Sequence, residues 1–213
     1  MSLPTPDEVS LLPLRERNKR DKLLRIKAAA KELFTELGYD AATTRDIARR
    51  AHVGLGTLFN YADDKRDLIF LVYLDDLNRI QQEAMGSIQP GQGLLDQLMV
   101  YFTPLYAEFA SNPTLARILL RELTFYHQGK LAVDFQQNRL RLVEHVEHLV
   151  AQAQADQYIE SQESAATIAL GLFFIYAGAV RLWIADEQPQ IETGLAHLRK
   201  QFHLLINGLL PRA

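Results

Sequence analysis

The residues of this 213-residue chain that could do chemistry are concentrated between positions 43 and 65, where threonine, arginine, asparagine and lysine alternate with small residues. Such side chains donate hydrogen bonds to phosphate oxygens and to the edges of bases. Other chemistry is not indicated, because the sequence lacks cysteine, a glycine-rich phosphate loop and a Ser-His-Asp order. We therefore expect a nucleic-acid-binding segment, and neither an enzyme nor a cofactor or metal site.

A helix-turn-helix would position these side chains. The residues from Thr43 to Tyr61 have the pattern of two short helices, the second at Leu55–Asn60, joined by the turn His52-Val53-Gly54. The Thr43 hydroxyl can accept from the backbone N–H of Asp46, as in a capping box. The second helix of such a unit lies in the major groove of DNA. We predict DNA contacts from Thr43, Thr44, Arg45, Gly54, Leu55, Gly56, Thr57, Phe59, Asn60 and Lys65.

The distribution of charge agrees with a polyanionic partner. The net charge of −3 conceals 11 Lys/Arg against 6 Asp/Glu over residues 13–62, so that the rest of the chain is acidic. A basic cluster precedes the first apolar stripe and could follow the DNA backbone or enter the minor groove. Its members are Arg15, Arg17, Lys19, Arg20 and Lys22.

Residues 19–68 resemble the N-terminal domain of the tetracycline-repressor (TetR) family. The matching residues are Thr44-Arg45-Asp46-Ile47-Ala48, Gly56-Thr57-Leu58-Phe59 and Lys65-Arg66-Asp67-Leu68, preceded by Ala29, Phe34 and Gly38. Four positions depart from the family pattern, namely His52, Gly54, Phe59 and Ala62. The resemblance implies a homodimeric transcription regulator, commonly a repressor that a small molecule releases from a palindromic double-stranded DNA operator.

Hydrophobic spacing predicts an all-α chain of about nine helices. We expect a flexible basic arm at 1–18, a three-helix DNA-binding domain at 19–68 and a helical effector-binding and dimerisation domain at 69–213. The segment Gln89–Gly93 is a predicted hinge. Beyond the DNA-binding domain, helices are expected at Lys65–Met85, Leu94–Ser111, Pro113–His127, Ala132–Asp156, Gln162–Glu187 and Ile191–Leu210.

The last two helices are expected to pair with their copies in a homodimer. The final helix carries an apolar seam, and the helix before it is apolar nearly all round, which predicts burial on all sides. The stretch Ala165–Val180 falls short of the ~20 residues that a membrane span needs, so no membrane is expected. With no signal peptide and no cysteine, the expected location is the cytoplasm. The seam consists of Ile191, Leu195, Leu198, Phe202, Leu205 and Leu209.

Aromatic residues are frequent in the middle helices and suit an apolar pocket with few polar groups. We expect a hydrophobic or aromatic effector to contact Phe102, Tyr106, Phe109, Arg121, Phe125, Tyr126, Phe174 and Trp183. The same side chains could instead be ordinary core. Two alternatives for the whole chain stay open. One is a helical ligand-binding or interaction protein that has lost DNA binding, and the other is an enzyme, for which His145 and His148, three residues apart on a helix, could hold a metal.

Overall fold

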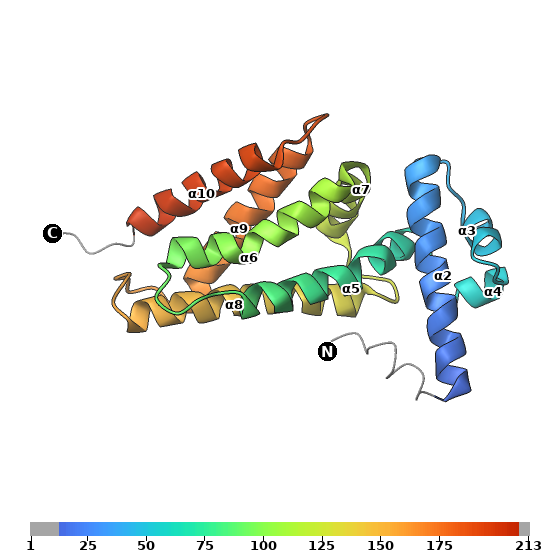
Figure 1. Cartoon of the computed structure of the whole chain (residues 1–213), viewed down its shortest axis with the longest axis horizontal. Helices are drawn as coiled ribbons and strands as arrows, with labels where there is room; N and C mark the ends of the chain where they lie inside the picture. Colours follow the sequence, from blue (N-terminus) through green and yellow to red (C-terminus); the bar gives the residue numbers. More distant parts are fainter. Residues whose placement is uncertain (1–12, 209–213) are drawn as a thin grey trace. The chain divides into compact units, whose positions relative to one another are not determined.

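The computed structural model describes residues 13–208, apart from the side chain of Phe125. Over this range the chain has nine α-helices, one short 3-10 helix and no strand (Figure 1), which confirms the predicted all-α fold. The helices are α2 (Leu14–Glu36), α3 (Thr44–Arg50), α4 (Leu55–Leu58), α5 (Lys65–Gly86), α6 (Leu94–Ser111), α7 (Pro113–Glu122), the 3-10 helix η1 (Leu123–Phe125), α8 (Ala132–Ala155), α9 (Ala165–Ile184) and α10 (Ile191–Gly208).

The chain divides into two compact units. Of the described residues, unit 1 comprises 13–75 together with Arg121–Phe135, and unit 2 comprises Asp76–Leu120 and 136–208. The boundary therefore falls inside α5 rather than after residue 68, where we expected it. The loop Gln89–Gly93, expected to be a hinge, joins α5 to α6 within unit 2.

Helix α2 is the wall of unit 1 against which the shorter helices pack. Its buried stripe begins at Ile26 and continues through Ala30 and Phe34, and α2 ends before Gly38, whose φ of +79° favours glycine. Residues 14–18, expected to belong to a flexible arm, are instead the first turns of this helix. Their side chains are all exposed, so no apolar periodicity marks them. The remainder of the expected arm, residues 1–12, lies outside the described residues.

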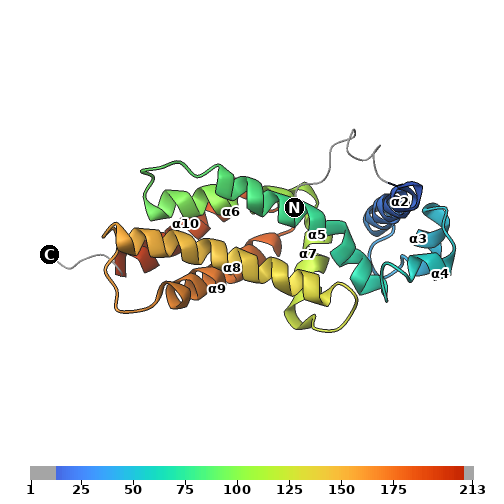
Figure 2. The same cartoon turned by 90° about the horizontal axis from the view of Figure 1, so that it is seen from below.

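Unit 2 is held together by an aromatic core. Helix α10 packs against α6 and α9 (Figures 1 and 2). The ring of Phe102 lies 4.4 Å from that of Tyr176 and 5.4 Å from that of Phe202, and Tyr106 lies 4.7 Å from Trp183. Large buried rings of this kind supply much of the apolar area that stabilises a helical bundle.

Helix α7 is shorter than expected. It ends at Glu122 and continues as η1 to Phe125, whereas the sequence predicted a helix as far as His127. Tyr126 has extended backbone, and its hydroxyl donates to the buried carboxylate of Asp67. A tertiary hydrogen bond in unit 1 thus coincides with the end of the helix.

Candidate nucleic-acid interface

The start of α3 is fixed by Thr43. Its Oγ1 accepts from the backbone N–H of Asp46 at 3.1 Å, as predicted, and donates to the Asp46 carboxylate at 2.6 Å. The hydrogen bond from the Thr43 hydroxyl, together with the positive charge of Arg49, holds the pKa of Asp46 below its ordinary value.

The turn between α3 and α4 is braced from α2. His52 has a φ of 53°, in the left-handed region where the resembling family has glycine. Arg25 on α2 donates from Nη1 to the carbonyls of Ala51 at 3.1 Å and His52 at 3.3 Å. Because the guanidinium satisfies two carbonyls at once, the departure at His52 leaves a well-defined turn.

A second guanidinium fixes α3 itself. Arg50 donates to Glu36 at 3.0 and 3.1 Å and to Glu32 at 3.2 Å, both of which lie on α2. The hydrogen bond from Arg50 lowers the pKa of Glu36. Arg45 on the same short helix makes no hydrogen bond or ion pair within residues 13–208, so its guanidinium is available to a partner.

Helix α4 is short and presents little side-chain bulk on its outer side. Leu58 is fully buried and anchors it, while Gly54, at the N-cap, and Gly56 are exposed. A Cβ at Gly54 would meet nothing closer than 3.9 Å, and one at Gly56 would meet nothing within 4 Å. The fold therefore requires neither glycine for space, and both leave the backbone open to an approaching molecule. The helix ends at Leu58, two residues earlier than predicted.

All ten residues predicted to contact DNA are accessible, and none belongs to the core. Thr43, Arg45, Gly54, Gly56, Phe59 and Asn60 are exposed, and Thr44, Leu55, Thr57 and Lys65 are partly exposed. Lys65 Nζ donates to the carbonyls of Tyr39 at 2.7 Å and Asp40 at 3.1 Å. An ammonium has three donors, so one remains for a phosphate.

Sequence reasoning missed the contribution of the connection between α7 and α8 to this unit. Lys130 pairs with Asp63 at 2.7 Å and donates to the carbonyl of Phe59, the residue that follows α4. Its backbone N–H donates to Asp67 at 3.1 Å. Asp67 is fully buried and also accepts from the backbone N–H of Asp63 at 2.8 Å. Nothing in the local pattern around Lys130 indicates a partner some 70 residues earlier.

Residues 26–72 match the model of a family described as bacterial regulatory proteins, tetR family. The N-terminal domain belongs to the tetR family. Its two short helices, turn and supporting α2 are those of this TetR-family domain, and the resemblance stated from the sequence is confirmed.

Other proteins are similar over more of the chain. The repressor KstR of Rhodococcus jostii is 27% identical over 150 residues, which are 70% of this chain and 65% of KstR. The fold resembles that of Thermus thermophilus FadR in complex with lauroyl-CoA, with a TM-score of 0.71 and 23% identity, over 90% of this chain and 96% of FadR. It also resembles Bacillus subtilis FadR in complex with stearoyl-CoA, with a TM-score of 0.70 and 18% identity, over 87% of this chain and 98% of that FadR. The TetR-family fold thus extends beyond the DNA-binding domain.

The residues predicted to contact an effector are divided between the two units. Phe102, Tyr106, Phe109 and Trp183 are buried in unit 2. Phe174 is 62% exposed on α9. Arg121 and Tyr126 belong to unit 1, where Arg121 pairs with Glu122 and Tyr126 with Asp67, and the side chain of Phe125 is outside the described residues. The four buried rings are therefore the part of the prediction that remains a candidate pocket lining.

Two buried polar atoms in unit 2 have no hydrogen-bond partner within the described residues, the hydroxyl of Tyr106 and Oε1 of Gln81. Gln81 donates from Nε2 to Asn138 at 3.1 Å, and Asn138 donates to Asn78 at 2.7 Å. Buried polar groups in folded proteins are nearly always paired with protein, water or a ligand. These two atoms therefore mark places where a bound molecule could make a hydrogen bond.

His145, considered above as a metal ligand, is engaged in a different contact. Its Nδ1 lies 3.0 Å from the hydroxyl of Tyr101, and His148 is exposed. No group of three or more His, Cys, Asp or Glu side chains in residues 13–208 is arranged to hold a metal ion. Burial lowers the pKa of His145.

Helix α9 has an uncovered apolar face. It is long and apolar enough to cross a membrane by length and composition, and 28% of its most apolar 18-residue stretch is buried. Within the single chain α9 is therefore not buried on all sides, and its burial in a homodimer stays a prediction. One stripe, which includes Leu172 and Tyr176, faces the core. The opposite stripe, spaced by four residues, consists of Leu170, Phe174, Gly178 and Leu182.

Helix α10 also divides its apolar residues between the core and the outside. Leu198 and Phe202 of the predicted seam are buried with Ile206, whereas Leu195 and Leu205 are partly exposed. An open hollow of about 730 Å³ lies along α9 and α10. It is lined by Phe174, Ile175, Gly178, Ala179, Leu182, Trp183, Asp186, Gln190, Thr193, His197 and Gln201. Leu209 of the seam lies outside the described residues.

Proposed function

We propose that this protein is a dimeric transcription repressor whose TetR-family domain binds operator DNA and whose unit 2 binds a small effector. The observation that carries the proposal is the accessibility of all ten predicted contact residues on a domain that matches the tetR family. The departures at His52 and Gly54 leave the unit intact, because the turn is braced by Arg25 and α4 is anchored by Leu58.

In this proposal α4 enters the major groove, where its glycines let the backbone approach the bases closely. Leu55 would contact a thymine methyl, and the unpaired guanidinium of Arg45 would reach a guanine edge or a phosphate. Thr43, Thr57 and Lys65 would contact phosphates and fix the orientation of the domain. A single α4 reads few base pairs, so a second copy of the chain is needed for a specific operator.

The exposed stripe of α9 and the hollow beside α10 are the surface that we assign to dimerisation. Soluble monomers rarely expose a continuous apolar patch of this extent, and a twofold contact would cover it with the same patch of the partner. Gly178 lies in the middle of the stripe with open space around its Cα, so a partner helix could approach closely there. Two copies of α9 and α10 would form a four-helix interface.

For the effector we propose a long-chain acyl-CoA. Two proteins of similar fold were crystallised with such molecules. In this chain the aromatic interior of unit 2 suits an apolar chain, and the unpaired Tyr106 hydroxyl could bind a carbonyl. The effector would favour one arrangement of the helices that pass between the units, α5, α7 and α8, and so change the spacing of the two copies of α4.

Selection of bound sequences from a random duplex pool tests DNA binding, symmetry and half-site spacing together. We expect a palindromic consensus with half-sites about one or more helical turns apart, and binding that weakens steeply as salt rises. Failure to enrich any duplex at low salt would overturn the proposed function.

The selected operator then tests the effector by fluorescence anisotropy. Lauroyl-CoA and stearoyl-CoA are expected to release the protein from a labelled operator, and coenzyme A alone is the control. Tyr106→Phe should weaken the response about tenfold, which corresponds to about 1.4 kcal/mol, while the protein remains as stable as the wild type. Unchanged operator affinity at saturating concentrations of both acyl-CoAs would exclude this effector class.

A further inference from the structure

The first three turns of α2 lie outside the part of the chain that defines the family and outside the core. The family match begins at Ile26, which is also the first fully buried residue of the helix. Every side chain from Leu14 to Arg25 is exposed or partly exposed. These turns therefore add almost no apolar burial to unit 1, and their composition needs another explanation.

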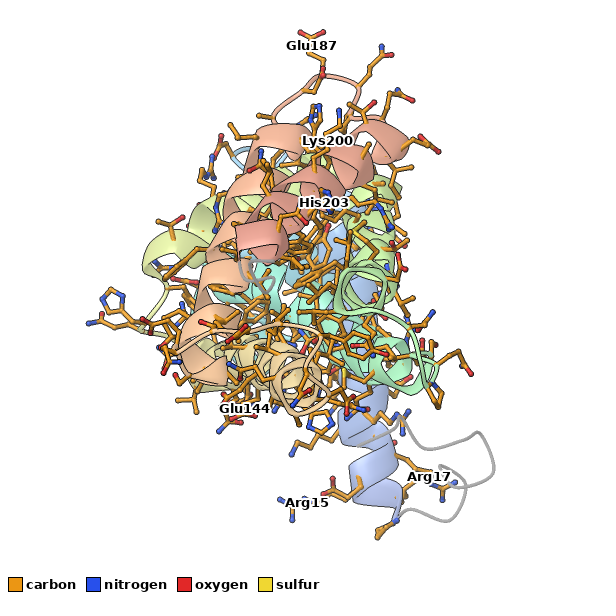
Figure 3. All side chains as sticks on the ribbon, turned by 90° about the vertical axis from the view of Figure 1, so that its left-hand side faces the viewer. Arg15, Arg17, Glu144, Glu187, Lys200 and His203 are labelled. Atoms are coloured by element: carbon orange, nitrogen blue, oxygen red, sulfur yellow. The ribbon has the colours of Figure 1, made fainter. Side chains whose placement is uncertain are left out.

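Their composition is strongly basic. Residues 14–25 contain six Arg or Lys and two acidic residues, Glu16 and Asp21. Asp21 pairs with Arg25 at 3.0 Å, which itself holds the α3–α4 turn. The other five cations make no side-chain hydrogen bond or ion pair within residues 13–208; they are Arg15, Arg17, Lys19, Arg20 and Lys22. Figure 3 shows Arg15 and Arg17 projecting from the end of the helix.

Part of this basic surface forms one groove with the end of α4. The groove has a volume of about 760 Å³, and its walls are Leu14, Arg15, Asn18, Lys19 and Lys22 from α2 and Thr57, Asn60 and Tyr61 from α4 and the residues after it. The hydroxyl of Tyr61 donates to the carbonyl of Lys19 at 3.0 Å, so the two walls are fixed to one another. Thr57 and Asn60, both predicted DNA contacts, thus share a surface with three unpaired cations.

The spacing of those cations matches one face of a helix. Arg15, Lys19 and Lys22 are separated by four and three residues, and at 1.5 Å per residue they span about 10 Å. Duplex DNA carries one negative charge per about 1.7 Å of its axis, so a row of this length meets several phosphates. Asn18, on the same wall, can donate to a further phosphate oxygen.

We propose that the first three turns of α2 are a second DNA-contacting element, which binds the phosphate backbone beside α4 through Arg15, Lys19 and Lys22. This inference rests on the proposed function, because it assigns the groove to the duplex that α4 reads. The contact adds affinity without sequence preference and lengthens the stretch of DNA that each subunit covers.

The test compares two triple variants of the full chain that lose the same charge. The first is Arg15→Gln/Lys19→Gln/Lys22→Gln. The control is Lys31→Gln/Arg139→Gln/Lys200→Gln, which neutralises three exposed cations elsewhere whose side chains also make no hydrogen bond or ion pair within the described residues. Operator affinity is measured by fluorescence anisotropy over a range of salt concentrations, and circular dichroism verifies that each variant is folded.

For the groove variant we expect the slope of log affinity against log salt to become shallower by about 0.9 for each lost contact, or about 5 for the six contacts of a dimer. The loss should be equal for operator and random duplexes. The control should keep the wild-type slope. The wild type should bind duplexes trimmed at the flanks of the operator with lower affinity than the full operator. The groove variant should bind the trimmed and full duplexes with the same affinity.

The outcomes separate this inference from the proposed function. A wild-type protein that binds no duplex would overturn both. Wild-type binding with the same salt slope in the two variants would overturn the inference alone, as would a loss confined to the operator sequence. A groove variant that binds DNA normally and loses affinity for heparin would assign the surface to another polyanion and likewise overturn it.

Discussion

At the scale of single residues, the glycines of α4 have no function inside the protein. Neither Gly54 nor Gly56 has a positive φ, and a Cβ added at either would meet no close neighbour. Gly54 is the N-cap, where glycine is tolerated, whereas Gly56 lies within the helix, where a glycine costs about 0.5–1 kcal/mol relative to alanine. A residue that destabilises its own helix without a structural reason is explained when a partner must approach the backbone there. Their exposure on the helix predicted to read DNA supports that explanation.

Gly56→Gln should therefore separate binding from folding. The protein should keep its thermal midpoint or gain slightly, because the side chain meets open space and the helix loses a glycine. Operator affinity should fall at least tenfold, since a long side chain would keep α4 away from the base edges. Gly86→Gln is the matched control, because Gly86 is also exposed with open space around it. Equal operator affinities for the two variants would contradict this role for Gly56.

His145 gives unit 2 a dependence on pH. Burial lowers its pKa below the ordinary value of about 6.5, so the folded protein binds fewer protons than the unfolded chain just below that pH. Stability is then complete above about pH 6.5 and is lost as the pH falls through the folded-state pKa. Urea unfolding at pH 7.5 and 5.5 should show a larger loss for the wild type than for His145→Asn, whose amide can still reach Tyr101. An identical loss in both proteins would show that His145 is not the group responsible.

At the scale of elements, the sequence predicted the bounds of a helix correctly where an apolar stripe marked them. It did not predict a bound that coincides with a tertiary contact. The helices α5, α6 and α10 begin at their expected residues, because an apolar stripe starts there directly after a turn signal. The first turns of α2 were missed because Leu14 is their single apolar residue and no apolar stripe marks them. The end of α7 was missed because it coincides with a hydrogen bond to Asp67, 59 residues away. The residues predicted to contact DNA came from the local pattern and the resemblance to the TetR family, and their contacts stay a prediction.

The connection between α7 and α8 is fixed to the DNA-binding domain by Asp67. This buried carboxylate accepts from the Tyr126 hydroxyl and from the backbone N–H groups of Asp63 and Lys130. Burial and the bond to Asp67 raise the pKa of Tyr126. Gly129 has a φ of +129°, and a Cβ there would lie 2.5 Å from Asp67 Oδ1, so no side chain fits at this position.

Tyr126→Phe should destabilise unit 1 by about 1.5–3 kcal/mol, because it removes a hydrogen bond to a buried charge. Gly129→Ala should cost at least as much, since it adds strain and a clash at the same carboxylate. Urea unfolding followed by circular dichroism measures both. Tyr158→Phe, at a tyrosine that is 53% exposed, should leave stability unchanged. If Tyr126→Phe and Tyr158→Phe unfold at the same urea concentration, the hydrogen bond from Tyr126 to Asp67 contributes nothing to the free energy of unfolding.

At the scale of the whole molecule, the open question is what covers the apolar stripe of α9. The sequence predicted a dimer from a seam on α10, but the structure divides that seam, and Leu198 and Phe202 belong to the core of the single chain. Heptad spacing shows which residues lie on an apolar stripe of a helix. It does not show whether that stripe packs in the core of the single chain or against a second copy. The stripe of Leu170, Phe174, Gly178 and Leu182 could be identified only once the neighbours of α9 were known.

Phe174→Glu should convert the proposed dimer into a monomer. The side chain is 62% exposed in the single chain, so the charge is tolerated by the fold, but burying it unpaired against a partner would cost several kcal/mol. Sedimentation velocity should show the change in mass, and affinity for a two-half-site operator should fall far more than affinity for a single half-site. Leu140→Glu, at an equally accessible leucine of α8, is the control and should remain dimeric. A Phe174→Glu protein that stays dimeric would place the subunit contact on another surface, and the palindromic operator would then have to be read by a different arrangement of the two copies of α4.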